Sequence, residues 1–374
     1  MIASMWRRLR PRGPARPKTV VLHVGAGKTG TSAIQTWLAR NHGRLAKHGI
    51  LYPEPPEGFA LAVEGKITTG NATPVVQYTN RKRRLPGFDE AEFLAFVDAL
   101  LRRPADAVLF SSEILPGGEP RQFAALKSFV EERNARVKVV YAVRNAADHA
   151  FSKWGQMVKR HGSTLTWDEF CRQSSVPFLR VLDRFSAVFG RDAIEVINYE
   201  RDKADMVRRL LSAVTPVDFG DTTVGTVNRS LSAREVELMR AFNAAVAERT
   251  SDAVLRDRLA TELSDHLIYA ADLPPLRLSL SAEQFAFLHA SLGETVDAIN
   301  NRYLPDQPIA VADSKVVTGA VETVELSPAD LSLMRELAAL AAGGAVQIGK
   351  LVGEGDGLKA LSRAVREAAA GAEP

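Results

Sequence analysis

The sequence predicts an α/β protein built on a P-loop-type parallel β-sheet flanked by helices, with a mainly helical C-terminal part. Apolar runs of strand length alternate with segments of helical periodicity through about the first 200 residues. The first apolar run ends in a glycine-rich loop, and a helix follows this loop. From Ser230 onward, helical patterns replace strands. Repeated strand–helix–strand order favours parallel strands with right-handed crossovers, and such sheets bind ligands at the carboxyl ends of their strands.

The first strand and its loop form the strongest local signal. Residues 20–24 are a β-type apolar run, and residues 25–32 read GAGKTGTS. Glycines allow the backbone to close around an anion, and the next helix offers unpaired N–H groups and its positive dipole end. That helix is indicated by Ile34, Trp37, Leu38 and Leu45, which share one face. We therefore expect a phosphate-binding loop with these candidate ligands: Gly27, Lys28, Thr29, Gly30, Thr31 and Ser32.

This loop is shorter than a Walker A loop. The Walker A pattern requires a glycine, four residues and then Gly-Lys-Ser/Thr. Gly27, Lys28 and Thr29 fit the end of the pattern, but its first glycine would fall on Leu22. The incomplete match makes a P-loop kinase or NTPase an alternative function and not the leading one.

The remaining elements follow in α/β order. Asp89 is expected to cap a helix, with Glu92 as its capping-box partner. The buried face of this helix is expected to hold these residues: Phe93, Phe96, Val97, Leu100 and Leu101. Further elements are predicted in this order: a strand at 107–111, a helix from Pro120, strands at 137–143 and 194–198, helices from Ser232 and Ser281, and an alanine-rich helix capped by Ser327.

Residues 25–35 resemble the 5′-phosphosulfate-binding loop of sulfotransferases that use 3′-phosphoadenosine 5′-phosphosulfate (PAPS). Bacterial carbohydrate-type members have His-Ile-Gly-x-x-Lys-Thr-Gly-Thr-Thr-x-Ile-Gln, followed by Gly-x-x-Tyr-Pro. Here residues 23–35 read HVGAGKTGTSAIQ, and residues 49–53 read GILYP. Val24 and Ser32 are the departures, and serine keeps the hydroxyl group. The resemblance implies a sulfotransferase fold over about residues 18–305, with PAPS as the donor and its product PAP.

Three further segments are similar to the same family. Arg144 follows the strand at 137–143 and Ser152 lies in the next helix, like the family's 3′-phosphate site, although Asn145 and His149 replace the family's Asp and second Arg. Residues 194–200 read IEVINYE, similar to the family's strand that ends in Tyr-Glu beside the adenine, which makes Tyr199 a candidate to border the base. Residues 228–232 read NRSLS, like the family's Asn-x-Ser-Leu-Ser loop, which makes Arg229 a candidate ligand. A plain ion pair for Arg144 and a packing role for Tyr199 are the alternatives.

The chemistry implied by the family is in-line sulfuryl transfer to a hydroxyl or amine. Lys28 would stabilise charge on the leaving phosphate, in analogy to phosphoryl transfer. Glu113 follows the strand at 107–111 and is the first candidate for the general base, with Glu54 as its competitor. His23 lies within the first strand and is expected to be packed or hydrogen-bonded. No metal ligand set is expected.

Composition fits an enzyme with a large core. The chain has 374 residues, 46% hydrophobic residues and a net charge of +4, without an aromatic-studded basic stripe for nucleic acid. Its one cysteine, Cys171, is expected in a buried helix and suits a reducing compartment. We expect a basic disordered leader at 1–17, a sulfotransferase domain at 18–305, and a helical extension at 306–374 that packs on the core or mediates homo-oligomerisation.

These observations predict a cytoplasmic PAPS-dependent sulfotransferase without a transmembrane segment. Its acceptor is expected to be a carbohydrate or another small hydroxylated molecule, a class that rests on the family resemblance. The rival interpretations are a P-loop kinase or NTPase, and a nucleotide-binding protein without catalytic activity.

Overall fold

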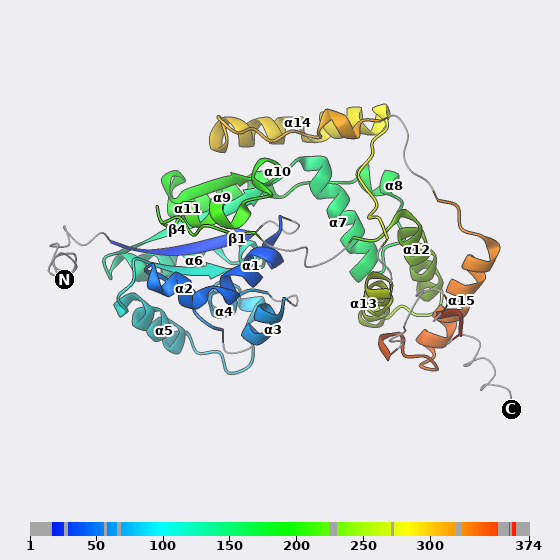
Figure 1. Ribbon diagram of the computed structural model, residues 1–374, viewed down its shortest axis with the longest axis horizontal. Coiled ribbons are helices and arrows are strands. Elements are labelled where there is room, and N and C mark those ends of the chain that lie inside the picture. The colour runs from blue at the N-terminus through cyan, green and yellow to red at the C-terminus, as the bar shows by residue number, and fades with distance from the viewer. Residues whose placement is uncertain are drawn as a thin grey trace, which may run out of the picture. The chain divides into compact units, whose positions relative to one another are not determined.

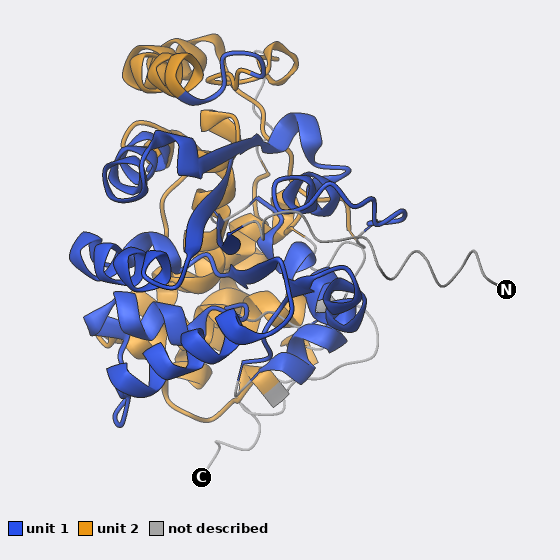
Figure 2. Ribbon diagram, turned by 90° about the vertical axis from the view of Figure 1, so that its left-hand side faces the viewer, with its two compact units in different colours: residues 1–143, 177–227, 303–307 blue, residues 144–176, 228–302, 308–374 orange. Residues whose placement is uncertain are grey.

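The computed structural model describes residues 17–25, 29–55, 58–65, 69–223, 230–270, 273–318, 324–350, 359 and 361–363 (Figure 1). The chain forms two compact units, shown in different colours in Figure 2. One comprises residues 1–143, 177–227 and 303–307, and the other comprises residues 144–176, 228–302 and 308–374. Each unit draws on separate stretches of the chain, and the domain boundary expected near residue 305 stays a prediction.

The first unit is built on a parallel sheet, which confirms the predicted α/β fold. Its five strands are β1 (Lys18–Gly25), β2 (Ile50–Leu51), β3 (Ala107–Ser111), β4 (Ala135–Val143) and β5 (Ile194–Asn198), in the order β2-β3-β1-β4-β5. Central strand β1 is buried on both faces, which explains its continuous apolar run. Register places His23 beside Ser111, and Gly25 beside Ala142.

Helices cover both faces of this sheet (Figure 1). One face, marked by Val21, Leu109 and Ile197, forms a core with residues of α1 and α11. On the other face, ring contacts join Phe110 to Phe96 of α5, and Tyr141 to Phe178 of α9. The helices of this unit are α1 (Thr31–Arg40), α2 (His42–Lys47), α3 (Phe59–Glu64), α4 (Thr73–Thr79), α5 (Glu90–Arg102), α6 (Pro120–Glu131), α9 (Phe178–Phe189), α10 (Tyr199–Asp202) and α11 (Met206–Ser212). Short 3-10 turns lie at Arg81–Arg83, Leu115–Gly117 and Arg191–Ala193.

The second unit is helical, as the sequence predicts for the C-terminal part. Its helices are α7 (Ala146–Arg160), α8 (Trp167–Cys171), α12 (Ala233–Ala247), α13 (Ala253–Ala270), α14 (Ala282–Tyr303) and α15 (Pro328–Ala342), with 3-10 turns at Ser314–Val316 and Ile348–Lys350. The last residue of α14, Tyr303, is assigned to the first unit. Capping boxes begin α12 at Ser232 and α15 at Ser327. Helix α15 packs against α12 and α13 and buries Met334, Leu337 and Ala338. The C-terminal extension therefore contributes to the core of this unit.

The helices of the described segments include none with the length and apolar character needed to cross a bilayer.

Candidate functional site

The turn from β1 into α1 lies at the carboxyl edge of the sheet. Gly30 is the N-cap of α1 and has a φ of 74°, a left-handed conformation that glycine adopts without steric cost. A glycine in this position brings no side-chain oxygen to the first-turn N–H groups of the helix. Thr29 and Thr31 are buried, and Ser32 is half-buried. Gly27 and Lys28, the other candidate ligands of this loop, lie outside the described residues, as does Arg229.

Close backbone approach shapes the start of this turn. A Cβ atom built on Gly25 would lie 2.0 Å from Cγ2 of Thr31, so only glycine fits there without a shift. The threonine is thereby held against the end of β1. This geometry explains why the sequence places a glycine directly after the apolar strand.

The structure brings two sequence-predicted residues together at this edge. Thr31 Oγ1 donates a hydrogen bond of 3.0 Å to Oε2 of Glu113, which follows the end of β3. The Glu113 side chain is exposed. Parallel strands β1 and β3 are neighbours, so their carboxyl ends bring the first turn of α1 and this carboxylate side by side. The first turn of α1 and the candidate proton acceptor Glu113 therefore meet at one edge of the sheet.

The competing carboxylate has a different partner. Glu54 follows the short strand β2, is exposed, and has its Oε1 atom 3.4 Å from Nε2 of His42. Among the described contacts, this imidazole is the partner of the Glu54 carboxylate. The geometry therefore favours Glu113 over Glu54 as the carboxylate associated with the loop.

A buried polar network lies below the cradle. Nδ1 of His23 and Oγ of Ser111 are 2.8 Å apart, and Gln35 Nε2 lies 3.4 Å from the same oxygen. Burial lowers the pKa of His23 to about 4, so the imidazole is neutral near pH 7. The expectation of a packed, hydrogen-bonded His23 is confirmed.

Sequence reasoning missed the amide that fixes the end of β3. Asn71 Oδ1 accepts a 2.7 Å bond from the N–H of Ser111, and Asn71 Nδ2 donates to the carbonyl of Leu109 over 2.9 Å. Next to it, Gly70 has a φ of 78°, and a Cβ there would lie 2.0 Å from the Ser111 carbonyl oxygen. These contacts position the chain two residues before Glu113. The sequence signal for this contact is a Gly-Asn pair, Gly70-Asn71, in a loop.

Tyr199 lies beside the loop. A Cβ atom built on Gly30 would be 3.4 Å from Cε2 of Tyr199, so this ring borders the N-cap of α1. The tyrosine is half-buried and also packs against the core of the first unit. Its position suits either a ring beside a bound base or a packing role.

Arg144 and Ser152 belong to the second unit. Arg144 directly follows β4, and Ser152 lies on α7, as the sequence predicts. The Arg144 side chain is 14% exposed, with Nη2 3.5 Å from Oδ1 of Asp148. The loop, Glu113 and Tyr199 belong to the first unit, so their combination with Arg144 and Ser152 in one nucleotide site stays a prediction.

Neither thiol nor metal chemistry is indicated at these positions. Cys171 is buried at the end of α8, and burial together with the charge of Asp168 raises the pKa of its thiol to about 11. Within the segments that the structure describes, no group of three or more His, Cys, Asp or Glu side chains could hold a metal ion.

Comparison with known proteins gives similarity to solved structures only. No protein-family model matches the sequence, and no curated protein matches it. The chain is similar to the crystal structure of a sulfotransferase from Alicyclobacillus acidocaldarius, with 20% sequence identity and a TM-score of 0.35. The similarity covers 69% of this chain and 98% of that chain.

Proposed function

We propose that this protein is a sulfotransferase that moves a sulfuryl group from PAPS to a hydroxyl or amine of a carbohydrate or other small acceptor. The observation that carries the proposal is the hydrogen bond between Thr31 and Glu113 at a glycine-capped helix start. It joins a cradle suited to an anion with a group suited to accept a proton. The sequence motif from Gly25 to Ser32 supports the same conclusion.

We expect the loop to bind the phosphosulfate of the donor. The left-handed Gly30 begins α1 and leaves its first-turn N–H groups without a side-chain cap, which suits an anion at this helix start. Hydroxyl groups of the loop and first-turn N–H groups would hold the 5′ side of the nucleotide, with Lys28 as the mobile cation. The proposed binding residues are Gly27, Lys28, Thr29, Gly30, Thr31 and Ser32 on the 5′ side, Arg144 and Ser152 on the 3′-phosphate, and Tyr199 and Arg229 around the base.

The chain's own groups then have distinct chemical tasks. PAPS supplies a sulfuryl group on a good phosphate leaving group. Lys28 and the N–H groups of the first turn of α1 neutralise the charge that develops on the leaving oxygen. Glu113 accepts the proton of the attacking hydroxyl, and its exposed carboxylate is accessible to an acceptor. The single cysteine supports the cytoplasm as the location.

The same contact gives the alternative function a specific basis. In P-loop NTPases, an acidic residue at the end of a strand and the hydroxyl of the loop together hold Mg²⁺. Glu113 and Thr31 also bring a carboxylate and a hydroxyl together, although the Walker A hydroxyl would fall on Thr29. Leu22 in place of the first Walker A glycine argues against this alternative.

Calorimetry of the purified protein with PAP, adenosine 5′-phosphate and Mg²⁺–ATP separates the two functions. A sulfotransferase should bind PAP at least about tenfold more tightly than adenosine 5′-phosphate, which corresponds to about 1.4 kcal/mol. Tight Mg²⁺–ATP binding with weak PAP binding would instead establish the kinase or NTPase class. After a positive PAP result, PAP release from PAPS in the presence of an acceptor panel measures the transfer itself. PAP binding without PAP release from PAPS in the presence of any acceptor would indicate a nucleotide-binding protein without transferase activity.

A further inference from the structure

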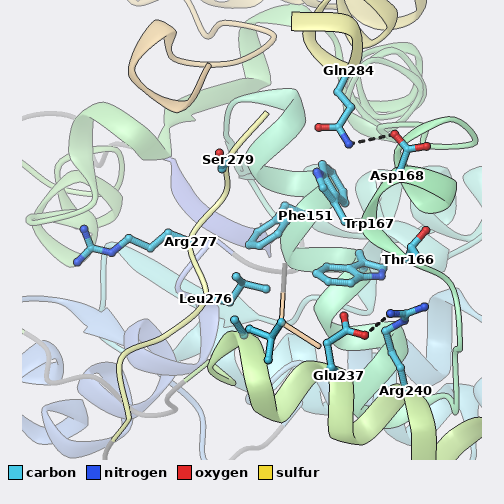
Figure 3. A pocket seen from close by; sticks show the side chains of 13 residues that line it. Phe151, Thr166, Trp167, Asp168, Glu237, Arg240, Leu276, Arg277, Ser279 and Gln284 are labelled. Carbon is cyan, nitrogen blue, oxygen red and sulfur yellow. Dashed lines mark hydrogen bonds and ion pairs between the residues drawn. The ribbon is translucent and has the colours of Figure 1, made fainter. Parts of the chain in front are cut away.

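A separate pocket lies within the second unit, and no part of the proposed donor site lines it (Figure 3). Its volume is about 380 Å³, within the lower range of pockets that hold small molecules. The walls come from α7, α8, α12 and an extended segment that includes Leu276 and Ser279. The pocket belongs to one compact unit, so its shape does not depend on the other.

Three aromatic rings form one wall of the pocket. Phe151 and Trp154 come from α7, and Trp167 is the first residue of α8. The ring centroids are 5.2 Å apart for Phe151 and Trp167, 5.5 Å for Phe151 and Trp154, and 5.9 Å for the two tryptophans. The planes of Phe151 and Trp167 are nearly perpendicular, at 89°, and both tryptophans are buried, so Phe151 is the most exposed ring of an apolar, angular wall.

Hydrogen bonds hold the walls in place. The indole N–H of Trp154 donates to the carbonyl of Leu165 over 2.8 Å, which fixes that ring. The extended segment is attached at Leu276, whose N–H donates to Leu231 over 2.9 Å, and at Leu280, whose N–H donates to Val316 over 2.8 Å. The pocket is therefore preformed, which lowers the ordering cost of binding.

The anionic groups at the pocket are two carboxylates, each already paired with an arginine, and Thr166, Ser279 and Gln284 are its neutral polar side chains. Asp168 bonds with Arg172, and Glu237 bonds with Arg240, as Figure 3 shows for the second pair. Arg277 also lines the pocket, but its guanidinium extends away from the three rings (Figure 3). Paired charges leave little net attraction for a charged ligand.

The carboxylates keep free capacity as hydrogen-bond acceptors. The bonds from Arg172 and Gln284 to Asp168 hold the pKa of its carboxyl below the usual range, so the group is ionised near pH 7. A carboxylate can accept about four hydrogen bonds. The described contacts use two of these at Asp168 and one at Glu237. A ligand that completes them must donate hydrogen bonds.

We infer that this pocket binds one ring of a neutral hydroxylated molecule, with its apolar part against Phe151 and the edges of the two tryptophans, and hydroxyl groups toward Asp168 and Glu237. Phenols and sugar rings share this chemistry. Binding itself is independent of the sulfotransferase proposal. Only the assignment of this ring to the sulfuryl acceptor rests on the proposed function.

The test measures binding of phenol and of methyl β-D-glucopyranoside to the full-length protein. The readout is the ¹H–¹⁵N spectrum of the indole groups, with the signals of Trp154 and Trp167 assigned through Trp154→Phe and Trp167→Phe. We expect saturable shifts of these signals at millimolar concentrations for at least one probe, and the responding probe identifies the aryl or the sugar class. Anisole, which cannot donate a hydrogen bond, should bind at least about fivefold more weakly than phenol if the aryl class applies.

Charged probes complete the test. Benzoate and benzyltrimethylammonium should each bind more weakly than the responding neutral probe. The inference is wrong if neither neutral probe shifts the two indole signals at about 50 mM, a concentration that detects even very weak sites. Tighter binding of benzyltrimethylammonium would also overturn it, since the pocket would then be a cation-binding aromatic cage.

Two variants locate the binding in this pocket. Glu237→Gln should lower the affinity for the responding probe about fivefold, because an uncharged amide oxygen forms a weaker hydrogen bond than a carboxylate oxygen. Its control is Glu248→Gln, at the exposed C-cap of the same helix, which should bind like the wild type. Phe151→Ala should abolish detectable binding, with thermal unfolding as the check on its fold. PAP calorimetry on the same samples separates the two proposals, because each binding event can fail while the other is retained.

Discussion

Thr31 and Glu113 are joined by a 3.0 Å hydrogen bond although 82 residues separate them in the chain. A hydroxyl has a single proton, so Thr31 cannot donate to Glu113 and to a bound anion at the same time. Binding of an anion at the start of α1 therefore competes with this bond or requires a proton on the carboxylate. The pair couples the donor side of the proposed site to its proton acceptor.

Gly25→Ala tests the geometry of the cradle. The added methyl group would meet Cγ2 of Thr31 at 2.0 Å, so the turn must shift. We expect a loss of about 1–3 kcal/mol in the free energy of unfolding, measured by urea denaturation, together with weaker PAP binding. Gly43→Ala is the matched control, because nothing lies within 4 Å of a Cβ at that position in α2. A variant at Gly25 as stable as wild type, with full PAP affinity, would contradict the close approach.

His23→Gln tests the buried network through the pH dependence of stability. The folded-state pKa of His23 is about 4 because of burial, below the ordinary value of 6.5. Between these values the unfolded chain binds the proton and the folded chain does not, so wild-type stability falls as the pH drops from 6.5 toward 4. The difference in pKa corresponds to about 3 kcal/mol over this window. In urea denaturation at pH 7, 6, 5 and 4.5, the free energy of unfolding of His23→Gln should not show the decrease that comes from protonation of His23.

His161→Gln provides the control for the histidine experiment, since this side chain is 48% exposed in its contact with Asp257. It should retain most of the acid sensitivity of the wild type. An equal loss of acid sensitivity in both variants would mean that the effect does not come from the buried imidazole.

The sequence predicts the elements that follow from simple periodicity. Strand β1 and the second half of strand β4, residues 139–143, are recognisable because burial on both faces requires continuous apolar runs. Strand β2 has two residues and no such run, so it has no signal of its own. Asp89 is confirmed as a cap, since its carboxylate accepts bonds from Ala91 and Glu92.

The contacts that place the candidate site are less visible in the sequence. Asn71 acts on Ser111 across 40 residues, and only the folded sheet brings them together. The glycine-rich motif predicts an anion cradle locally, whereas the bond from Thr31 to Glu113 depends on the strand order. Long-range pairs of this kind require the fold, because each partner alone looks like an ordinary polar residue.

Arg144→Ala tests the proposed 3′-phosphate contact. Calorimetry with PAP and adenosine 5′-phosphate should show a wild-type preference for PAP that shrinks by about 1.5–3 kcal/mol in the variant, the range of a charged hydrogen bond. Arg249→Ala, near the end of α12, should leave the preference unchanged. An unchanged preference in Arg144→Ala would contradict the proposed contact of this guanidinium with the 3′-phosphate.

Lys28→Ala tests the stabilisation of the leaving group. Loss of a charge that acts in the transition state should reduce turnover to less than about a tenth of wild type, with the free energy of unfolding preserved. Sulfuryl transfer is measured with the acceptor found in the panel, and folding by urea denaturation. Turnover above about a tenth of wild type in a folded variant would contradict the role of Lys28 in stabilising the leaving group.

Glu113→Gln and Glu54→Gln decide which carboxylate is the general base. Glutamine keeps a hydrogen-bond acceptor for Thr31 but cannot take up a proton. At saturating PAPS we expect Glu113→Gln to lower kcat by about 10²–10⁴ while PAP affinity stays close to wild type. Glu54→Gln should retain activity, because its carboxylate pairs with His42. The reverse result would move the base to the segment after Tyr52 and Pro53, and less than about a tenfold loss in both variants would exclude both carboxylates as the base.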